Sequence, residues 1–90
     1  MIGKEQFIAE AIRVAREHGY RIESNARTGQ TQIDFGNKKL HAGHLGKLYP
    51  SALVPNANIS SLIERVAPGR PCSHKPMRAI IEQLRTEGKL

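Results

Sequence analysis

The spacing of apolar residues changes twice along this 90-residue chain, which limits the folds open to it. Near the N-terminus apolar residues recur every three or four positions, which is the helical period. They then alternate with polar residues, as in strands, and after residue 58 the helical spacing returns. This order predicts an α+β fold with an N-terminal helix, a three-stranded antiparallel meander and two C-terminal helices. A chain of this length forms a single small domain, residues 1–90.

The first helix is predicted over Gln6–His18, because one apolar stripe runs along it at helical spacing. Gly19 follows directly, and glycine readily takes the left-handed conformation that ends a helix. The stripe consists of Phe7, Ile8, Ala11, Ile12 and Ala15.

Three short strands are expected next, because apolar and polar residues alternate strictly. The first covers Tyr20–Glu23 and the second Thr31–Phe35, with the polar loop Ser24–Gln30 between them. Gly36-Asn37 is typical of a tight hairpin turn and leads to the third strand, Lys38–His41.

The segment 43–57 has too many apolar residues for an exposed loop, yet Pro50 and Pro55 disfavour a long helix. We therefore expect one helical turn, at about His44–Tyr49, followed by an extended segment packed on the core. The apolar residues are Leu45, Leu48, Tyr49, Leu53 and Val54.

Two helices complete the prediction. Asn58 caps the first, which stops at Pro68-Gly69, and Ser73 caps the second, which ends at Gly88. Their apolar residues follow the same template: Ile59, Leu62, Ile63 and Val66, then Met77, Ile80, Ile81 and Leu84.

The net charge of +6 is carried entirely by the segment Gly36–Ile81, whereas acidic and basic residues balance on either side of it. Such a distribution indicates a basic surface that faces an anionic partner, most commonly a polyphosphate. The alternative is a solvated basic face kept for solubility. Within the segment the charged residues are Lys38, Lys39, Lys47, Arg65, Arg70, Lys75 and Arg78 against Glu64.

We expect the main contact with phosphate at the start of the last helix, where basic residues gather. These are Arg70, His74, Lys75 and Arg78, and Lys38, Lys39 and Lys47 would extend the surface. The predicted function is therefore that of a regulatory or accessory factor, rather than an enzyme, that binds a nucleic-acid duplex, with DNA favoured over RNA. About five phosphate contacts would give a log–log salt slope near −4 to −5.

The last two helices and the end of the chain, Leu84–Leu90, resemble helix-turn-helix and winged-helix DNA-binding domains. That resemblance implies that Lys75 and Arg78 approach the major groove. The connection Ala67–Cys72 has six residues and two prolines, longer than the usual turn. The order of elements also resembles double-stranded-RNA-binding domains and small RNA-cleaving toxins, but Ser24–Gln30 lacks the histidine that those toxins use.

The histidines and the single cysteine allow two further hypotheses. His41, His44, Cys72 and His74 could form a tetrahedral zinc site, although Cys72 is also typical of a small buried residue. His41 and His44 could instead act as general acid and base in metal-free RNA cleavage, as in a toxin. The simpler alternative is that His41 and His44 are solvent-facing or phosphate-facing cations. We predict no cofactor and no catalytic residue.

A third class of function is a small inhibitor or adaptor that binds a protein partner of a nucleic-acid machine, or a homodimer. The apolar residues of segment 43–57 would then be an exposed anchor, so their burial discriminates the two classes. Aromatic residues are scarce, and Tyr49 alone is free of an expected core position. Single-strand binding by base stacking is therefore disfavoured.

The sequence also suggests where the protein resides. Cys72 has no partner for an intramolecular disulfide, which favours a reducing cytoplasm. No signal peptide or membrane-spanning run is recognisable, so we expect a soluble cytoplasmic protein without a membrane partner.

Overall fold

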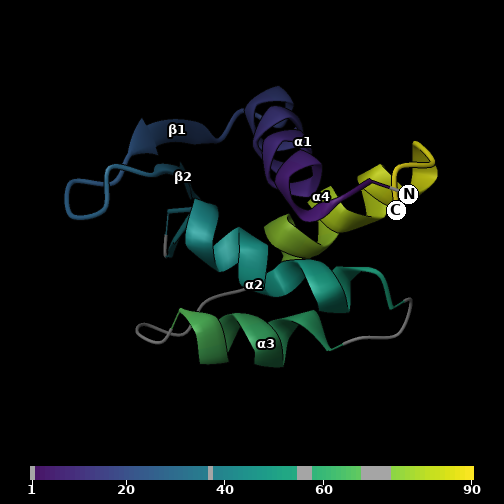
Figure 1. The fold of residues 1–90 in the computed structure, drawn as a ribbon. Helices are drawn as coiled ribbons and strands as arrows, with labels where there is room; N and C mark the ends of the chain where they lie inside the picture. Colours follow the sequence, from purple (N-terminus) through teal and green to yellow (C-terminus); the bar gives the residue numbers. More distant parts are fainter. Residues whose placement is uncertain (1, 37, 55–57, 68–73) are drawn as a thin grey trace.

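The computed structural model describes residues 2–36, 38–54, 58–67 and 74–90. Figure 1 shows the order of its elements. They are α1 (Lys4–Glu17), β1 (Arg21–Ser24), β2 (Thr31–Asp34), β3 (Lys39–His41), α2 (Ala42–Ala52), α3 (Ile59–Val66) and α4 (Lys75–Thr86). The predicted α+β class, with an N-terminal helix, a three-stranded antiparallel sheet and then helices, is confirmed.

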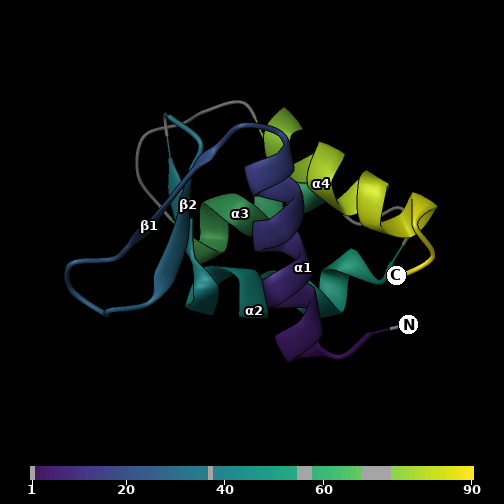
Figure 2. The same ribbon diagram turned by 90° about the horizontal axis from the view of Figure 1, so that it is seen from above.

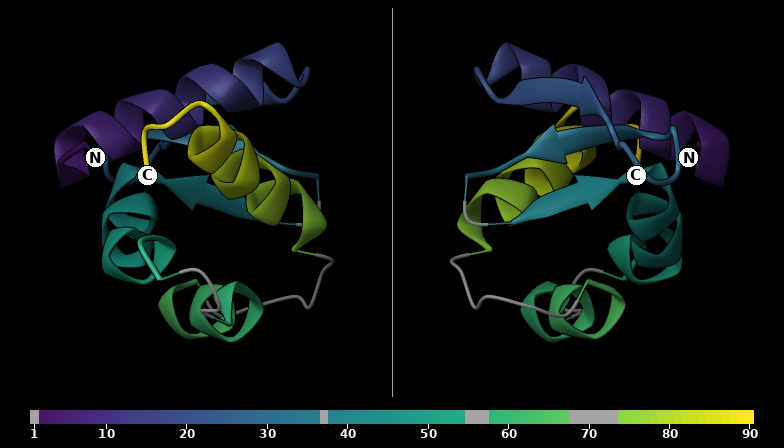
Figure 3. Two further views of the ribbon diagram at one scale, coloured as in Figure 1. Left: turned by 90° about the vertical axis from the view of Figure 1, so that its right-hand side faces the viewer. Right: turned by 90° about the vertical axis from the view of Figure 1, so that its left-hand side faces the viewer.

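The three strands form an antiparallel meander in the order β1-β2-β3. Ile33 at the centre of the sheet pairs with Ile22 on one side and Leu40 on the other. Because side chains alternate along a strand, these apolar residues share one face and the polar residues share the other. Figure 3 shows α4 on one side of the sheet, and the other side turned towards the viewer in its right panel.

One hydrophobic cluster joins all four helices to the sheet. Ile33 and Leu40 enter it from β2 and β3 and are almost completely buried. The apolar faces of α1 and α4 supply much of the remainder: Phe7, Ala11, Val14 and Ala15, and Met77, Ile80, Ile81 and Leu84. The α4 residues are the predicted stripe, whereas in α1 Val14 joins the predicted Phe7, Ala11 and Ala15, and Ile8 and Ile12 are only partly buried.

Local signals explain where two helices begin or end. Gly19 follows the C-cap of α1 with φ of +88°, a conformation that other residues rarely adopt. Asn58 is the N-cap of α3, and its Oδ1 accepts a hydrogen bond of 3.1 Å from Ser61 N–H, as predicted. Gly36 also has a positive φ, of +90°, while Asn37 lies outside the described residues.

Segment 43–57 differs from its prediction, because α2 is an 11-residue helix rather than one turn and an extended segment. Pro50 lies inside it, close to its C-terminal end. Leu45, Leu48 and Ala52 are fully buried on one face. Burial of each leucine contributes about 2–3 kcal/mol, which offsets the backbone hydrogen bond that Pro50 cannot make.

The start of α4 also differs in detail. His74 occupies the N-cap position and Pro76 lies in the first turn, where proline is tolerated because the first amides have no helical partner. Ser73, the predicted cap, lies outside the described residues, as do Pro68 and Gly69. The helix α2 lies between the sheet and the two C-terminal helices, α3 and α4, that were expected.

Candidate nucleic-acid interface

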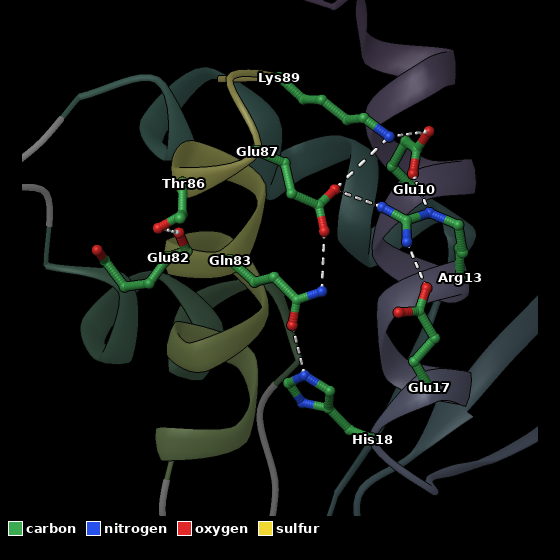
Figure 4. Close-up of polar contacts among 9 residues, drawn as sticks. All are labelled: Glu10, Arg13, Glu17, His18, Glu82, Gln83, Thr86, Glu87 and Lys89. Carbon is green, nitrogen blue, oxygen red and sulfur yellow. Dashed lines mark hydrogen bonds and ion pairs between the residues drawn. The ribbon is translucent and has the colours of Figure 1, made fainter.

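Charges near the two ends of the chain neutralise one another across α1 and the C-terminal part of the structure (Figure 4). Arg13 of α1 forms ion pairs with Glu10, Glu17 and Glu87, the last at 2.6 Å. Lys89 Nζ lies 2.9 Å from Glu10 Oε1 and 3.6 Å from Glu87 Oε1. Glu10, Glu17 and Glu87 are thus held by cations from the two ends of the chain.

The pKa values of these carboxyl groups reflect the pairing. Hydrogen bonds from Lys89 and Arg13 lower the pKa of Glu10 below its usual value. The pKa of Glu87 is lowered by a hydrogen bond from Gln83 and by Arg13. Both groups remain ionised well into the acid range, so the neutralisation persists at physiological pH.

Other cations are exposed and form no ion pair with any residue that the structure describes. They are Lys4, Arg16, Arg27, Lys47, Arg65 and Arg78. Among the carboxylates, only Glu5 and Asp34 lack such a pair within the same described ranges. The surplus positive charge is therefore not neutralised internally, and it lies at the surface.

Lys38, a predicted contact residue, lies inside the molecule rather than on this surface. Its side chain is 7% exposed, its Nζ donates a 2.6 Å hydrogen bond to Ala67 O, and it lies 3.4 Å from Glu64 Oε2. His74, another predicted contact, is 9% exposed in its side chain, and its Nε2 lies 2.9 Å from Glu64 Oε1. Lys38 and His74 therefore join the β3 side of the sheet, α3 and α4 through one carboxylate.

Lys39 is exposed but already paired. Its Nζ lies 2.9 Å from Glu23 Oε1 across the polar face of the sheet. The pair raises the pKa of Lys39 and, with a hydrogen bond from Gln32, lowers the pKa of Glu23. A phosphate at this position would have to compete with Glu23.

The remaining predicted contacts fall into two groups. Lys75 and Arg78 both lie in the N-terminal part of α4, and Arg78 is exposed there. Lys47 belongs to α2, which lies on the opposite side of the molecule from the start of α4 (Figures 2 and 3). Arg70 lies outside the described residues. The structure therefore does not bring Lys47 to the α4 group.

Two of the histidines have a local structural role that the sequence analysis missed. His41 is the N-cap of α2, and its Nδ1 accepts hydrogen bonds from Gly43 N–H at 3.0 Å and His44 N–H at 3.4 Å. His44 Nδ1 in turn accepts from His41 N–H at 3.2 Å. The two rings stack with centroids 3.6 Å apart. His44 lies three positions after His41, which is the spacing of a capping box. This spacing is the feature of the sequence that could have indicated the capping role.

This arrangement also fixes the charge state of His44. Burial, then the nearby charges of His41, Lys47 and Lys38, lower the pKa of His44 to about 4. Its ring is neutral at pH 7. Within the described residues, no three His, Cys, Asp or Glu side chains are placed to hold a metal ion, and Cys72 lies outside them.

The apolar residues of segment 43–57 belong mainly to the core. Leu45 and Leu48 are fully buried, and Tyr49 packs against the core with its hydroxyl donating to Ile2 O at 2.6 Å. Leu53 is partly buried and Val54 is 52% exposed. They do not form the shared exposed anchor on which the protein-binding hypothesis depends.

The aromatic side chains are engaged within the fold. Phe7 is buried against Tyr49, with ring centroids 5.6 Å apart, and Tyr20 meets Phe35 edge-on at 5.0 Å. Each of these four rings contacts or belongs to the core. None is presented as an open stacking platform for bases.

No helix in the described part of the chain has the length and apolar character that crossing a membrane requires. The chain matches no protein-family model, no curated protein and no solved structure in the comparisons made with each.

Proposed function

We propose that this chain binds a nucleic-acid duplex through its phosphates, with DNA favoured, as a regulatory or accessory factor. The observation that carries this proposal is that Arg65 and Arg78 are exposed and form no ion pair with any described residue. Most acidic side chains are held in other ion pairs, among them those of Arg13, Lys89, Lys39 and Lys38, and within the described residues only Glu5 and Asp34 are not. Accessible cations that lack internal partners are available for phosphates.

The contact surface is proposed on the side formed by the end of α3 and the start of α4. Arg65 and Arg78 are exposed there, and Lys75 opens α4. Glu64, the carboxylate of this region, is engaged from within by Lys38 and His74. Its charge is thus compensated by buried partners, so it does not neutralise the arginines on the surface.

Phosphate contacts fit this surface better than base stacking does. The aromatic rings are committed to the core, while Arg65 and Arg78 can donate several hydrogen bonds to a phosphate. Contacts of this kind position a protein on a duplex and do not read its sequence. The proposal therefore concerns affinity for a duplex and leaves the target sequence open.

The test is a binding titration by fluorescence anisotropy with duplex DNA, duplex RNA and single-stranded DNA at several salt concentrations. Contacts from Arg65, Lys75 and Arg78 contribute about −3 to the expected log–log salt slope. Arg65→Gln and Arg78→Gln should each reduce the magnitude of that slope by about 1. Arg16→Gln, an exposed arginine of α1 without an ion pair among the described residues, is the matched control.

Two results would contradict the proposal. The first is an affinity for duplex that does not change with salt, since released counterions are the source of phosphate-driven binding. The second is an equal effect of Arg16→Gln and Arg78→Gln, which would indicate a nonspecific response to net charge.

A further inference from the structure

We propose that a groove between α1 and α2 seats a phosphodiester of the nucleic-acid strand, held by Lys4 and Lys47. The groove is open to solvent and has a volume of about 420 Å³. The nature of its occupant rests on the proposed function. Because α2 lies on the opposite side of the molecule from the start of α4 (Figures 2 and 3), the phosphodiester belongs to a nucleic-acid segment other than the one bound at the surface formed by α3 and α4. It is lined by Lys4, Glu5, Ile8, Gln30, Ala42, Gly43, Gly46 and Lys47.

Charge favours an anionic occupant. Lys4 on α1 and Lys47 on α2 both line the groove, both are exposed, and neither forms an ion pair within the described residues. Glu5 also lines it, so the formal charge of the lining is +1. Two ammonium groups from separate helices can approach one phosphate group from two directions.

The floor of the groove includes a helical glycine that packing does not require. A Cβ added at Gly46 would meet only Ile8 Cδ1 and Lys4 Cδ, each at 3.6 Å, which is ordinary contact. Glycine inside a helix costs about 1 kcal/mol relative to alanine. Because Gly46 has no side chain, only Ile8 Cδ1 and Lys4 Cδ lie beside the backbone there, and close approach of a ligand is a recognised use of glycine.

Gln30 adds a hydrogen-bond donor at the same place. Its Oε1 accepts a 3.0 Å hydrogen bond from Gly43 N–H, which fixes the orientation of the side-chain amide. Its Nε2 group then has no hydrogen bond with any described residue, and the side chain lines the groove. An amide donor beside two ammonium groups suits the several acceptor oxygens of a phosphodiester.

The experiment compares three variants of the full chain. Lys4→Gln/Lys47→Gln removes both cations, Gly46→Gln fills the floor, and Arg16→Gln removes an exposed α1 cation that is not part of the groove lining. Binding of duplex DNA is measured by anisotropy at several salt concentrations. The amide signals of Gly43 and Gly46 are followed by NMR during titration with duplex DNA and, separately, with a mononucleotide.

We expect the double variant to lower duplex affinity on the order of tenfold and to reduce the magnitude of the salt slope by about 2. Gly46→Gln should lower the affinity with less change in slope, and Arg16→Gln should leave both unchanged. The Gly43 and Gly46 signals should shift with duplex DNA in the wild-type protein. If Gly46→Gln does not fold, the two exposed lysines still provide the test.

Wild-type affinity retained in the double variant, without shifts at Gly43 and Gly46, would overturn the groove assignment and leave the proposed function standing. Absence of any duplex binding by the wild-type chain would overturn both. A mononucleotide that binds as tightly as the duplex and shifts the same signals would show that the occupant is a free phosphate compound rather than a strand.

Discussion

The interlocked histidines at the start of α2 make fold stability depend on pH. His44 Nδ1 can accept the hydrogen bond from His41 N–H only while that nitrogen carries no proton. Burial, followed by the charges of His41, Lys47 and Lys38, lowers the pKa of His44 to about 4, from an ordinary value of 6.5. The unfolded chain therefore takes up this proton more readily than the folded chain does.

The sign and size of the effect follow from proton linkage. Stability contributed by neutral His44 is complete above pH 6.5 and is lost as the pH falls from there through about 4. Across that window the loss amounts to about 3 kcal/mol, of which about 2 kcal/mol falls between pH 7 and pH 5. A domain of this size has a free energy of unfolding of about 5–10 kcal/mol, so the change is large.

The assay is urea unfolding of the wild-type chain and of His44→Gln at pH 7 and pH 5. Glutamine at this position can still accept from the N-cap amide, as in a capping box, but does not titrate. The wild-type chain should lose about 2 kcal/mol more than His44→Gln on acidification. Equal losses in the two proteins would show that His44 is not held neutral by the fold.

Four further substitutions test the fold by urea unfolding, and one of them, Lys38→Met, also tests the proposed interface through duplex binding. Gly43→Ala should lower the free energy of unfolding by about 1–3 kcal/mol, because the new Cβ would lie 2.9 Å from His41 Cε1. Gly46→Ala should leave it unchanged or raise it by up to about 1 kcal/mol. Equal effects of the two substitutions would contradict this packing. Lys38→Met should lower the free energy of unfolding by about 1–3 kcal/mol, because the hydrogen bond to Ala67 O is lost. It should not change the salt slope of duplex binding. A changed slope would place the Lys38 ammonium at the interface. Asn58→Ala should cost about 1 kcal/mol, and no loss would mean that the cap on α3 does not contribute.

The helices at both ends of the chain were predictable because each has a single apolar stripe at helical spacing. In α4 the residues of the stripe are the residues that the structure buries. In α1 the structure buries Phe7, Ala11 and Ala15 of the stripe together with Val14, which was not predicted, and leaves Ile8 and Ile12 partly buried. The strands were predictable for the same reason, since strict alternation placed Ile22, Ile33 and Leu40 on one face. The period of apolar residues predicts an element correctly when that element buries a single face against a single core.

The helix α2 was not predicted, because a local rule and a tertiary effect conflict there. Pro50 argues against a long helix by its missing amide. The structure places Pro50 near the end of α2, while Leu45 and Leu48 are buried against other elements. The energy of that burial depends on partners distant in sequence, so no local pattern reports it.

In the candidate site, too, some features follow from the local sequence and others depend on tertiary contacts. The basic character of segment 36–81 was legible from composition, but the partner of each cation depends on the fold. Glu64 is the only carboxylate in that segment, and nothing in the sequence indicated that it contacts Lys38 and His74 rather than Arg65. The capping role of His41 was hidden because histidine is an uncommon N-cap residue.

The distribution of charge follows from which parts of the chain the fold brings together. Ile2 N–H donates to Lys89 O at 3.1 Å, and Figure 1 shows the two ends of the chain side by side. Acidic residues near both ends therefore have cations of both ends within reach, and Arg13 and Lys89 join them across α1 and the C-terminal turn. Glu64 is engaged instead by Lys38 and His74, whose side chains are largely buried. Neutralisation among the described residues is thus local to the termini, the sheet and the interior, and Lys47, Arg65 and Arg78 of the middle segment stay exposed without an ion pair.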